Sequence, residues 1–127
     1  MTIVLSDLND AFRAAGDERP PDGTYAAKVL CSELGLSKAG NRHVRTELEF
    51  RNPKTGVPVI VQKYHGLEKD WLHYLRKDFH KLGVMIDSIE NLPVVLCSLK
   101  GWVIEIEFQE AGEWYTIDLI RAISRPC

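Results

Sequence analysis

Apolar and polar residues alternate along five stretches of this chain, and a period of two predicts β-strands. The clearest alternation covers residues 43–51, where one row contains Leu48 and Phe50 and the opposite row is mostly charged. Turn residues at 37–41 and 52–56 separate the first three stretches, and Pro and Gly in the second turn favour a hairpin. The predicted strands are 24–36, 43–51, 57–64, 101–109 and 114–123.

A different period, near 3.6, appears over residues 68–82 and predicts one amphipathic helix. Acidic residues in its first turn and basic residues in its last turn suit the helix dipole, and Gly83 provides the stop. Residues 87–93 then indicate a turn or short helix. The residues predicted to face the core are Trp71, Leu72, Leu75, Phe79 and Leu82 on the helix, and Val94, Val95, Leu96 and Leu99 beyond it.

The order of these elements is β-β-β-α-β-β, which is typical of a mainly β, five-stranded OB-fold barrel. We therefore expect an OB-fold domain over residues 20–127. Residues 1–19 are expected to form an N-terminal arm or short helix, because Leu5, Leu8 and Phe12 recur at helical spacing. OB barrels mostly bind oligonucleotides or oligosaccharides across one face of the sheet, although a fold alone does not determine the ligand.

Composition agrees with one soluble domain, since the chain has 127 residues, of which 45% are hydrophobic and 27% charged. No apolar run reaches the roughly 18–20 residues of a membrane span, so no membrane association is expected. The three cysteines lack CxxC spacing and the N-terminus lacks a secretory pattern, which together favour a reducing cytoplasm. With a net charge of −2, any binding to nucleic acid must depend on a local basic strip.

Strands 43–51 and 57–64, with the loops beside them, carry the ligand in an OB fold. Single-strand binding uses cations along the phosphate path and aromatic faces on which bases stack. The candidate cations are Lys38, Arg42, Arg45, Arg51 and Lys63, and the candidate stacking residues are Tyr64 and Trp114. The alternative for the arginines is a solvated strand face on which they pair with Glu47 and Glu49.

Six further aromatic residues are predicted to be core, because they lie on apolar rows or in phase with apolar neighbours. They are Tyr25, Phe50, Phe79, Trp71, Trp102 and Phe108. Three histidines, His65, His73 and His80, lie near one another in sequence, but no CxxC, HExxH or carboxylate cluster accompanies them, so no metal or cofactor is expected.

Motifs of common enzymes are absent from the sequence, which contains no GxSxG, P-loop or Rossmann fingerprint. We therefore expect a protein without enzymatic activity. Glu105 and Asp118 could form an acidic pair on neighbouring strands, which leaves an OB-fold hydrolase as a distant alternative.

Four short segments carry a family resemblance: Pro21-Asp22-Gly23-Thr24-Tyr25, the turn at 37–41, the helix end at 74–83, and Leu99-Lys100-Gly101-Trp102-Val103. In this order they resemble a family of phage and prophage proteins, formerly a domain of unknown function and now regarded as single-stranded-DNA-binding-protein-like. The resemblance covers most of residues 5–123. It implies an OB-fold binder of single-stranded DNA in phage replication or recombination, working in the bacterial cytoplasm beside replication or recombination proteins.

One departure from that resemblance concerns the end of the sequence. Single-strand binders of this kind commonly end in an acidic tail that recruits replication enzymes, whereas this sequence ends in Ser124-Arg125-Pro126-Cys127. Either this sequence stops short of such a tail or this protein lacks that mode of recruitment, so tail-mediated partners stay an open question at this point. The second hypothesis is a protein–protein module of a phage–host or replication complex, or a homodimer formed through a sheet edge.

Overall fold

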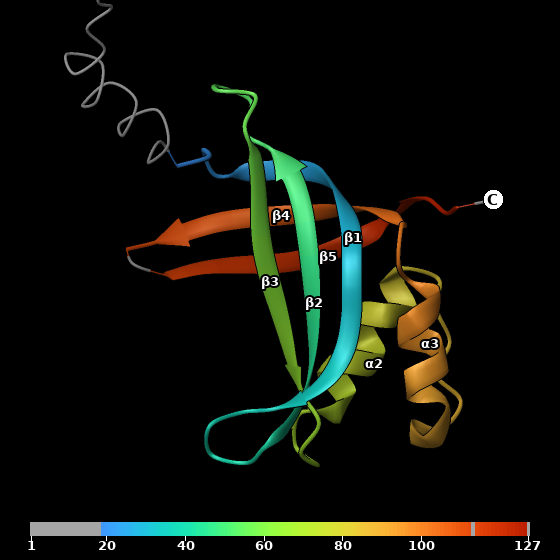
Figure 1. The fold of residues 1–127 in the computed structure, drawn as a ribbon. Coiled ribbons are helices and arrows are strands. Elements are labelled where there is room, and N and C mark those ends of the chain that lie inside the picture. The colour runs from blue at the N-terminus through green and yellow to red at the C-terminus, as the bar shows by residue number, and fades with distance from the viewer. Residues whose placement is uncertain (1–18, 113, 127) are drawn as a thin grey trace, which may run out of the picture.

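Five antiparallel strands and two short α-helices make up the described part of the chain, which is mainly β. The computed structural model describes residues 19–112 and 114–126 (Figure 1). The elements are β1 (Gly23–Leu36), β2 (Arg42–Arg51), β3 (Pro58–Gly66), α2 (Leu72–Lys81), the 3-10 turn η2 (Ile89–Asn91), α3 (Leu92–Ser98), β4 (Val103–Ala111) and β5 (Trp114–Ser124). All five predicted strands are confirmed, with ends within two residues of those expected.

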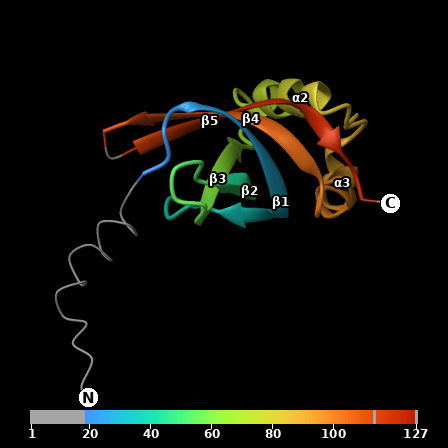
Figure 2. The same ribbon diagram turned by 90° about the horizontal axis from the view of Figure 1, so that it is seen from above.

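The long strand β1 joins two parts of the sheet, whose order is β3-β2-β1-β4-β5. Its first half pairs with β4 and its second half pairs with β2, and Lys28 has a partner on both sides. The register with β2 shifts between Val29 and Cys31, and an irregularity of this kind bends a strand. As a result, the β4–β5 hairpin crosses the direction of β2 and β3 and forms a second layer (Figures 1 and 2).

The core lies between these two layers. The apolar row of β2 is buried as its alternation predicts, and it meets the buried rows of β4 and β5. These rows contain Val44, Leu48 and Phe50 from β2, Ile104, Ile106 and Phe108 from β4, and Ile117 and Leu119 from β5. Trp102 is also buried, as predicted. Tyr25 is only half-buried, and its ring stacks on Phe50 with the centroids 4.4 Å apart.

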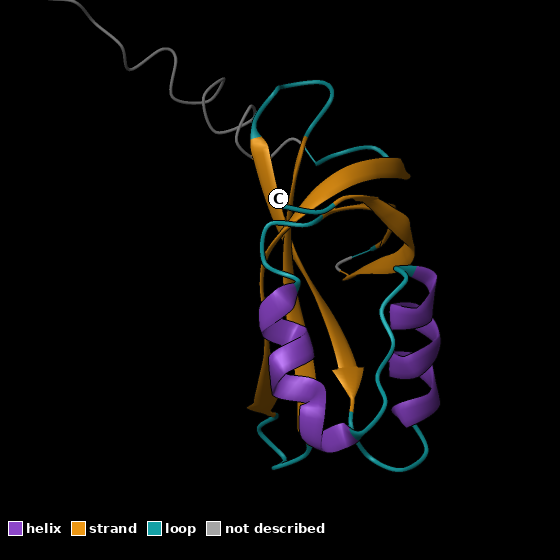
Figure 3. Ribbon diagram, turned by 90° about the vertical axis from the view of Figure 1, so that its right-hand side faces the viewer, coloured by secondary structure: helices purple, strands orange, loops and turns teal. Residues whose placement is uncertain are grey.

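The sheet is open, because among the described residues no strand ladder joins β3 to β5. The backbone N–H of Gln62 on β3 donates instead to the Tyr115 hydroxyl on β5 over 3.0 Å. Helix α2 packs against both strands. Both helices lie toward one end of the curled sheet, with α3 against β1 (Figure 3).

Helix α2 begins later than the sequence pattern indicates. Glu68 and Asp70 precede the helix, and Trp71 is its N-cap residue. Leu75, Phe79 and Leu82 are buried as predicted, but Trp71 is 56% exposed, so its assignment to the core is wrong. The physical reason is that Trp71 packs on Gly66 at the end of β3, where the missing side chain leaves room, with its Cβ 3.3 Å from the ideal Cβ position of that glycine.

A second helix, α3, occupies part of the region where the sequence indicated only a turn or short helix and scattered core residues. Leu92, Leu96 and Leu99 form its buried side, with the i, i+4 spacing of one helix face. Val94 lies on the other side and is 73% exposed, so the prediction that it is core is wrong.

The predicted N-terminal arm falls on residues 1–19, of which 1–18 lie outside the described residues. None of the helices in the described ranges is long and apolar enough to cross a membrane.

Candidate nucleic-acid interface

A hollow of about 720 Å³ opens where β2 begins and β3 ends. We call it the β2–β3 pocket. Its walls come from the β1–β2 loop, from both strands and from the residue that caps α2. It is lined by Leu36, Ser37, Lys38, Asn41, Arg42, His43, Tyr64, Gly66, Glu68 and Trp71.

The β1–β2 loop is a short, hydrogen-bonded turn that presents Lys38 to solvent. The Ser37 N–H donates to the Asn41 carbonyl over 2.8 Å, and the Gly40 N–H donates to the Ser37 carbonyl over 2.9 Å. Gly40 adopts a φ of 84°, which only glycine adopts without strain, so this turn depends on that residue. The loop therefore holds its cation beside Arg42, the first residue of β2.

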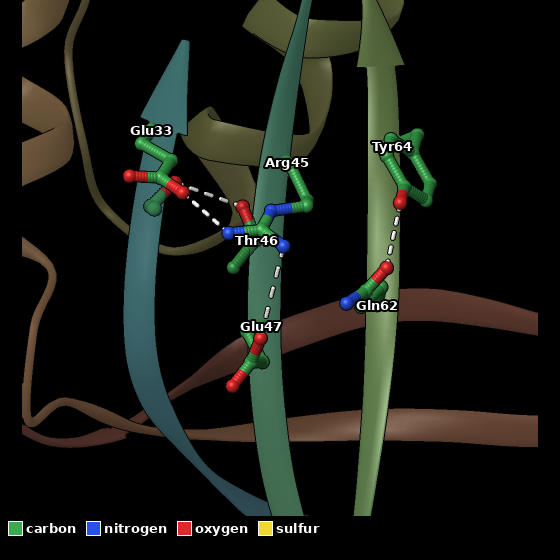
Figure 4. Close-up of polar contacts among 7 residues, drawn as sticks. Glu33, Arg45, Thr46, Glu47, Gln62 and Tyr64 are labelled. Atoms are coloured by element: carbon green, nitrogen blue, oxygen red, sulfur yellow. Dashed lines mark hydrogen bonds and ion pairs between the residues drawn. The ribbon is translucent and has the colours of Figure 1, made fainter. Parts of the chain in front are cut away.

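Two half-exposed aromatic rings stand at the pocket, Tyr64 at 53% exposure and Trp71 at 56%. The Tyr64 hydroxyl donates to the side chain of Gln62 over 2.6 Å (Figure 4). The Tyr64 ring meets the ring of His43 edge-on, with centroids 5.1 Å apart. Trp71 packs beside Tyr74, with ring centroids 5.7 Å apart. Both rings are therefore held in place while a large part of each stays open to a ligand.

The two cations of the pocket, Lys38 and Arg42, are exposed, and neither forms an ion pair with another described residue. Arg45 differs from them. Its guanidinium binds the Glu33 carboxylate across the β1–β2 ladder and lies 4.0 Å from Glu47 (Figure 4). The hydrogen bond to Glu33 raises the pKa of Arg45 above its ordinary value. Arg45 thus has the partners that the alternative interpretation of a paired, solvated face requires.

Arg51 and Trp114 lie away from the pocket. Arg51 is nine residues along β2 from Arg42, about 30 Å for an extended strand, and donates to the Gly56 carbonyl over 3.0 Å. Trp114, 79% exposed, lines a separate hollow with Ile60 and Tyr115, and this hollow shares no residue with the β2–β3 pocket. The structure therefore brings together Lys38, Arg42 and Tyr64 from the predicted set.

Lys63 follows the alternation of β3 and lies on the opposite side of the strand from Tyr64. Because β3 is an edge strand, the two side chains still line one further hollow, which runs along that edge toward α2. The proposed acidic pair of Glu105 and Asp118 is not formed: Asp118 is opposite Glu107, and Glu105 pairs with Arg121 over 3.2 Å.

A buried polar contact ties α2 to the end of β3. His65 Nε2 lies 2.8 Å from Asp78 Oδ2, and the His65 side chain is almost fully buried. Burial raises the pKa of the Asp78 carboxyl, but the hydrogen bond and charge of His65, with the nearby charges of Lys63 and Lys81, outweigh burial and lower that pKa below its ordinary value. The contact fixes α2 relative to the strand that carries Tyr64.

Positive charge is concentrated in one stretch of this acidic chain. Residues 38–81 contain ten Lys or Arg and five Asp or Glu, which gives a net charge of +5. Residues 82–127 contain three Lys or Arg and seven Asp or Glu, which gives a net charge of −4. This segregation is visible in the sequence and marks the same region as the pocket. Trp71 and Tyr74, which the site prediction missed, lie inside the positive stretch.

No known family model matches the sequence, and no curated protein matches it. Within the described ranges, no three His, Cys, Asp or Glu side chains gather closely enough to hold a metal ion. The function therefore has to be argued from the geometry and charge of the pocket.

Proposed function

We propose that this protein binds single-stranded DNA without strong sequence preference, with the DNA seated in the β2–β3 pocket. The observation that carries the proposal is the meeting of two half-exposed rings, Tyr64 and Trp71, with two exposed cations at one hollow. Aromatic faces stack on any base, at about 1–3 kcal/mol per base, and cations hold the phosphates between them. A pocket of this composition favours a single strand, because duplex bases have no free face to offer.

We also propose that the fold is a variant of the OB fold, which is a partly open Greek-key barrel. In support, the bent strand β1 pairs with both β2 and β4, and helical segments connect β3 to β4. The ligand of such a fold lies over β2 and β3, and the β2–β3 pocket opens at the end of these strands. The open gap between β3 and β5 is the main difference from a closed barrel.

A role in phage replication or recombination, inside the bacterial cytoplasm and beside replication or recombination proteins, is proposed from the sequence resemblance alone.

The test is fluorescence anisotropy with labelled dT15, titrated at several salt concentrations, with duplex DNA of equal length as competitor. Tight binding that prefers the single strand and weakens with salt supports the proposal. A log–log salt slope of about −2 to −4 corresponds to roughly three to six neutralised phosphates of a single strand. Absence of binding at low salt, or binding without salt dependence, would overturn it.

A parallel titration with oligo-rU of the same length tests the choice of DNA over RNA, which depends on contacts to the 2′-OH.

Charge reversal then tests the pocket itself. The variant Lys38→Glu/Arg42→Glu should lose about tenfold or more in affinity, since it places two negative charges on the phosphate path. The matched control is Lys54→Glu/Lys100→Glu, which changes the net charge equally at exposed positions outside the pocket. Equal losses in both variants would mean that only overall charge matters.

A second candidate, a protein–protein module or homodimer, is favoured by one observation. The hollow at Trp114, Tyr115 and Ile60 exposes large apolar side chains beside the open edges β3 and β5. Exposed apolar groups and unpaired strand edges are typical of protein contacts. Light scattering of the protein and of Trp114→Ala would test this candidate, which gains if dT15 does not bind and the oligomer depends on Trp114.

A further inference from the structure

Helix α2 carries an aromatic half and a basic half along one face. Tyr74, Lys77 and Lys81 follow one another at spacings of three and four residues, which places them on the same side of the helix. Trp71 caps the helix at the aromatic end. From Trp71 to Lys81 this face is about 15 Å long, at 1.5 Å per residue.

A second hollow, of about 400 Å³, lies along this face, and we call it the α2 hollow. Lys63 contributes from β3, Asp118 from β5, and Tyr74, Lys77 and Lys81 from α2. The α2 hollow shares Tyr64, Gly66 and Trp71 with the β2–β3 pocket, so the two meet at the pair of exposed rings.

The charges of the α2 hollow suit an anion. Lys63, Lys77 and Lys81 are opposed by Asp78 and Asp118. The Asp78 carboxylate, however, is mostly buried and already contacts His65 at 2.8 Å and Lys81 at 3.7 Å. The α2 hollow thus keeps a net positive charge.

The opposite direction along the sheet does not suit a polyanion. On the outward row of β2, Glu47 and Glu49 follow Arg45, and the next residue, Arg51, donates to the Gly56 carbonyl. Farther on, the strands β4 and β5 carry four described carboxylates and the single cation Arg121. Phosphates that leave the β2–β3 pocket toward the hairpin would therefore approach negative charge.

We infer that a bound single strand continues from the β2–β3 pocket across Trp71 and Tyr74 into the α2 hollow, with its phosphates on Lys63, Lys77 and Lys81. This inference depends on the proposed function and extends the site around the β3 edge, away from Trp114. Two phosphate contacts in the pocket and three in the α2 hollow make five in all. At about −0.7 per contact, a long oligonucleotide has a salt slope near −3.5 and a short one, held by the pocket alone, near −1.4.

The decisive variant is Lys77→Ala/Lys81→Ala in the full chain, measured by anisotropy with dT6 and dT15. We expect the slope for dT15 to become shallower by about 1.4, with roughly tenfold weaker binding at low salt, and no change for dT6. The control is Arg76→Ala/Lys100→Ala, because Arg76 is on α2 but, unlike Lys77 and Lys81, does not line the α2 hollow. The control should bind both oligonucleotides as the unmodified protein does.

An unchanged slope for dT15 in the lysine variant, or an equal loss in the control, would overturn the inference while leaving the proposed function standing. Failure of the unmodified protein to bind dT15 would instead overturn the proposed function.

The path of the strand into the α2 hollow can also be tested without variants. Lysine acetylation followed by mass spectrometry, with and without dT15, should show protection of Lys63, Lys77 and Lys81, whereas Lys54 and Lys100 stay reactive. Reactive Lys77 and Lys81 in the complex would contradict the path along α2.

Discussion

Two exposed tryptophans of this protein, Trp71 and Trp114, stand in different surroundings. Trp71 lies between two hollows that contain exposed cations, within the stretch of net charge +5. Trp114 lies beside Ile60 and Tyr115 on a hairpin rich in carboxylates. The comparison teaches that two equally prominent exposed rings can differ in the charge around them, and this charge decides which kind of ligand each surface would suit.

The largest effect is expected from truncating the rings at the pocket. Tyr64→Ala/Trp71→Ala should weaken binding to dT15 by more than about thirtyfold, since two stacking faces together contribute about 2–6 kcal/mol. Anisotropy titration measures this. Trp114→Ala, the control, should stay within about twofold. If Trp114→Ala loses as much as the double variant, the division between the two tryptophans is wrong.

The next effect concerns the contact that fixes α2 and, with it, the position of Trp71. Asp78→Asn should lower the free energy of unfolding at pH 7 by about 1.5–3 kcal/mol, because it removes a charged hydrogen-bond partner of buried His65. Thermal or urea unfolding measures the loss. The control is Asp118→Asn, which removes a carboxylate of the same hollow that forms no ion pair with another described residue. Its stability should stay close to that of the unmodified protein.

The lowered pKa of Asp78 gives this effect a pH dependence. A carboxyl whose pKa is depressed by folding stabilises the native state above its ordinary pKa, and the contribution is lost as the pH falls through the folded value. The difference in stability between the protein and Asp78→Asn should therefore shrink as the pH falls below about 4. A constant difference from pH 7 to pH 3 would contradict the role given to this carboxylate.

The smallest effect should come from the acidic row between the two tryptophans. Glu47→Gln/Glu49→Gln should strengthen binding to dT15 by about two- to fivefold at low salt, because it removes two like charges near the phosphate path. The gain should vanish at high salt, where exposed charges are screened. Weaker binding in this variant would mean that the carboxylates organise the site, for example by holding Arg45.

Sequence patterns predicted the strands because a period of two appears wherever one face is buried, as on β2. The start of α2 was misplaced because Glu68 and Asp70 imitate a first helical turn, whereas the cap depends on how Trp71 fits over Gly66. Helix α3 was not recognised as such, since an apolar run containing Pro93 is ambiguous between helix and strand. Closure of the sheet depends on pairing between β3 and β5, which no local pattern encodes.

The sequence predicted some residues of the β2–β3 pocket and missed others, again because local patterns do not encode tertiary contacts. Lys38, Arg42 and Tyr64 were found because they lie at strand ends or beside a glycine turn. The pairing of Arg45 with Glu33 follows from the ladder beyond the register shift in β1, which sequence spacing does not reveal. Trp71 was missed because its position in an apolar stripe outweighed its position at the helix start.

The separation of charge along this chain has a consequence for how the molecule meets its ligand. With +5 on residues 38–81, −4 on residues 82–127 and −3 on the rest, charge is unevenly distributed along the protein despite a net charge of only −2. The field of a polyanion turns such a molecule before contact, so that its positive side arrives first. Productive encounters should then be frequent at low ionic strength, and the acidic hairpin should point away from the bound strand.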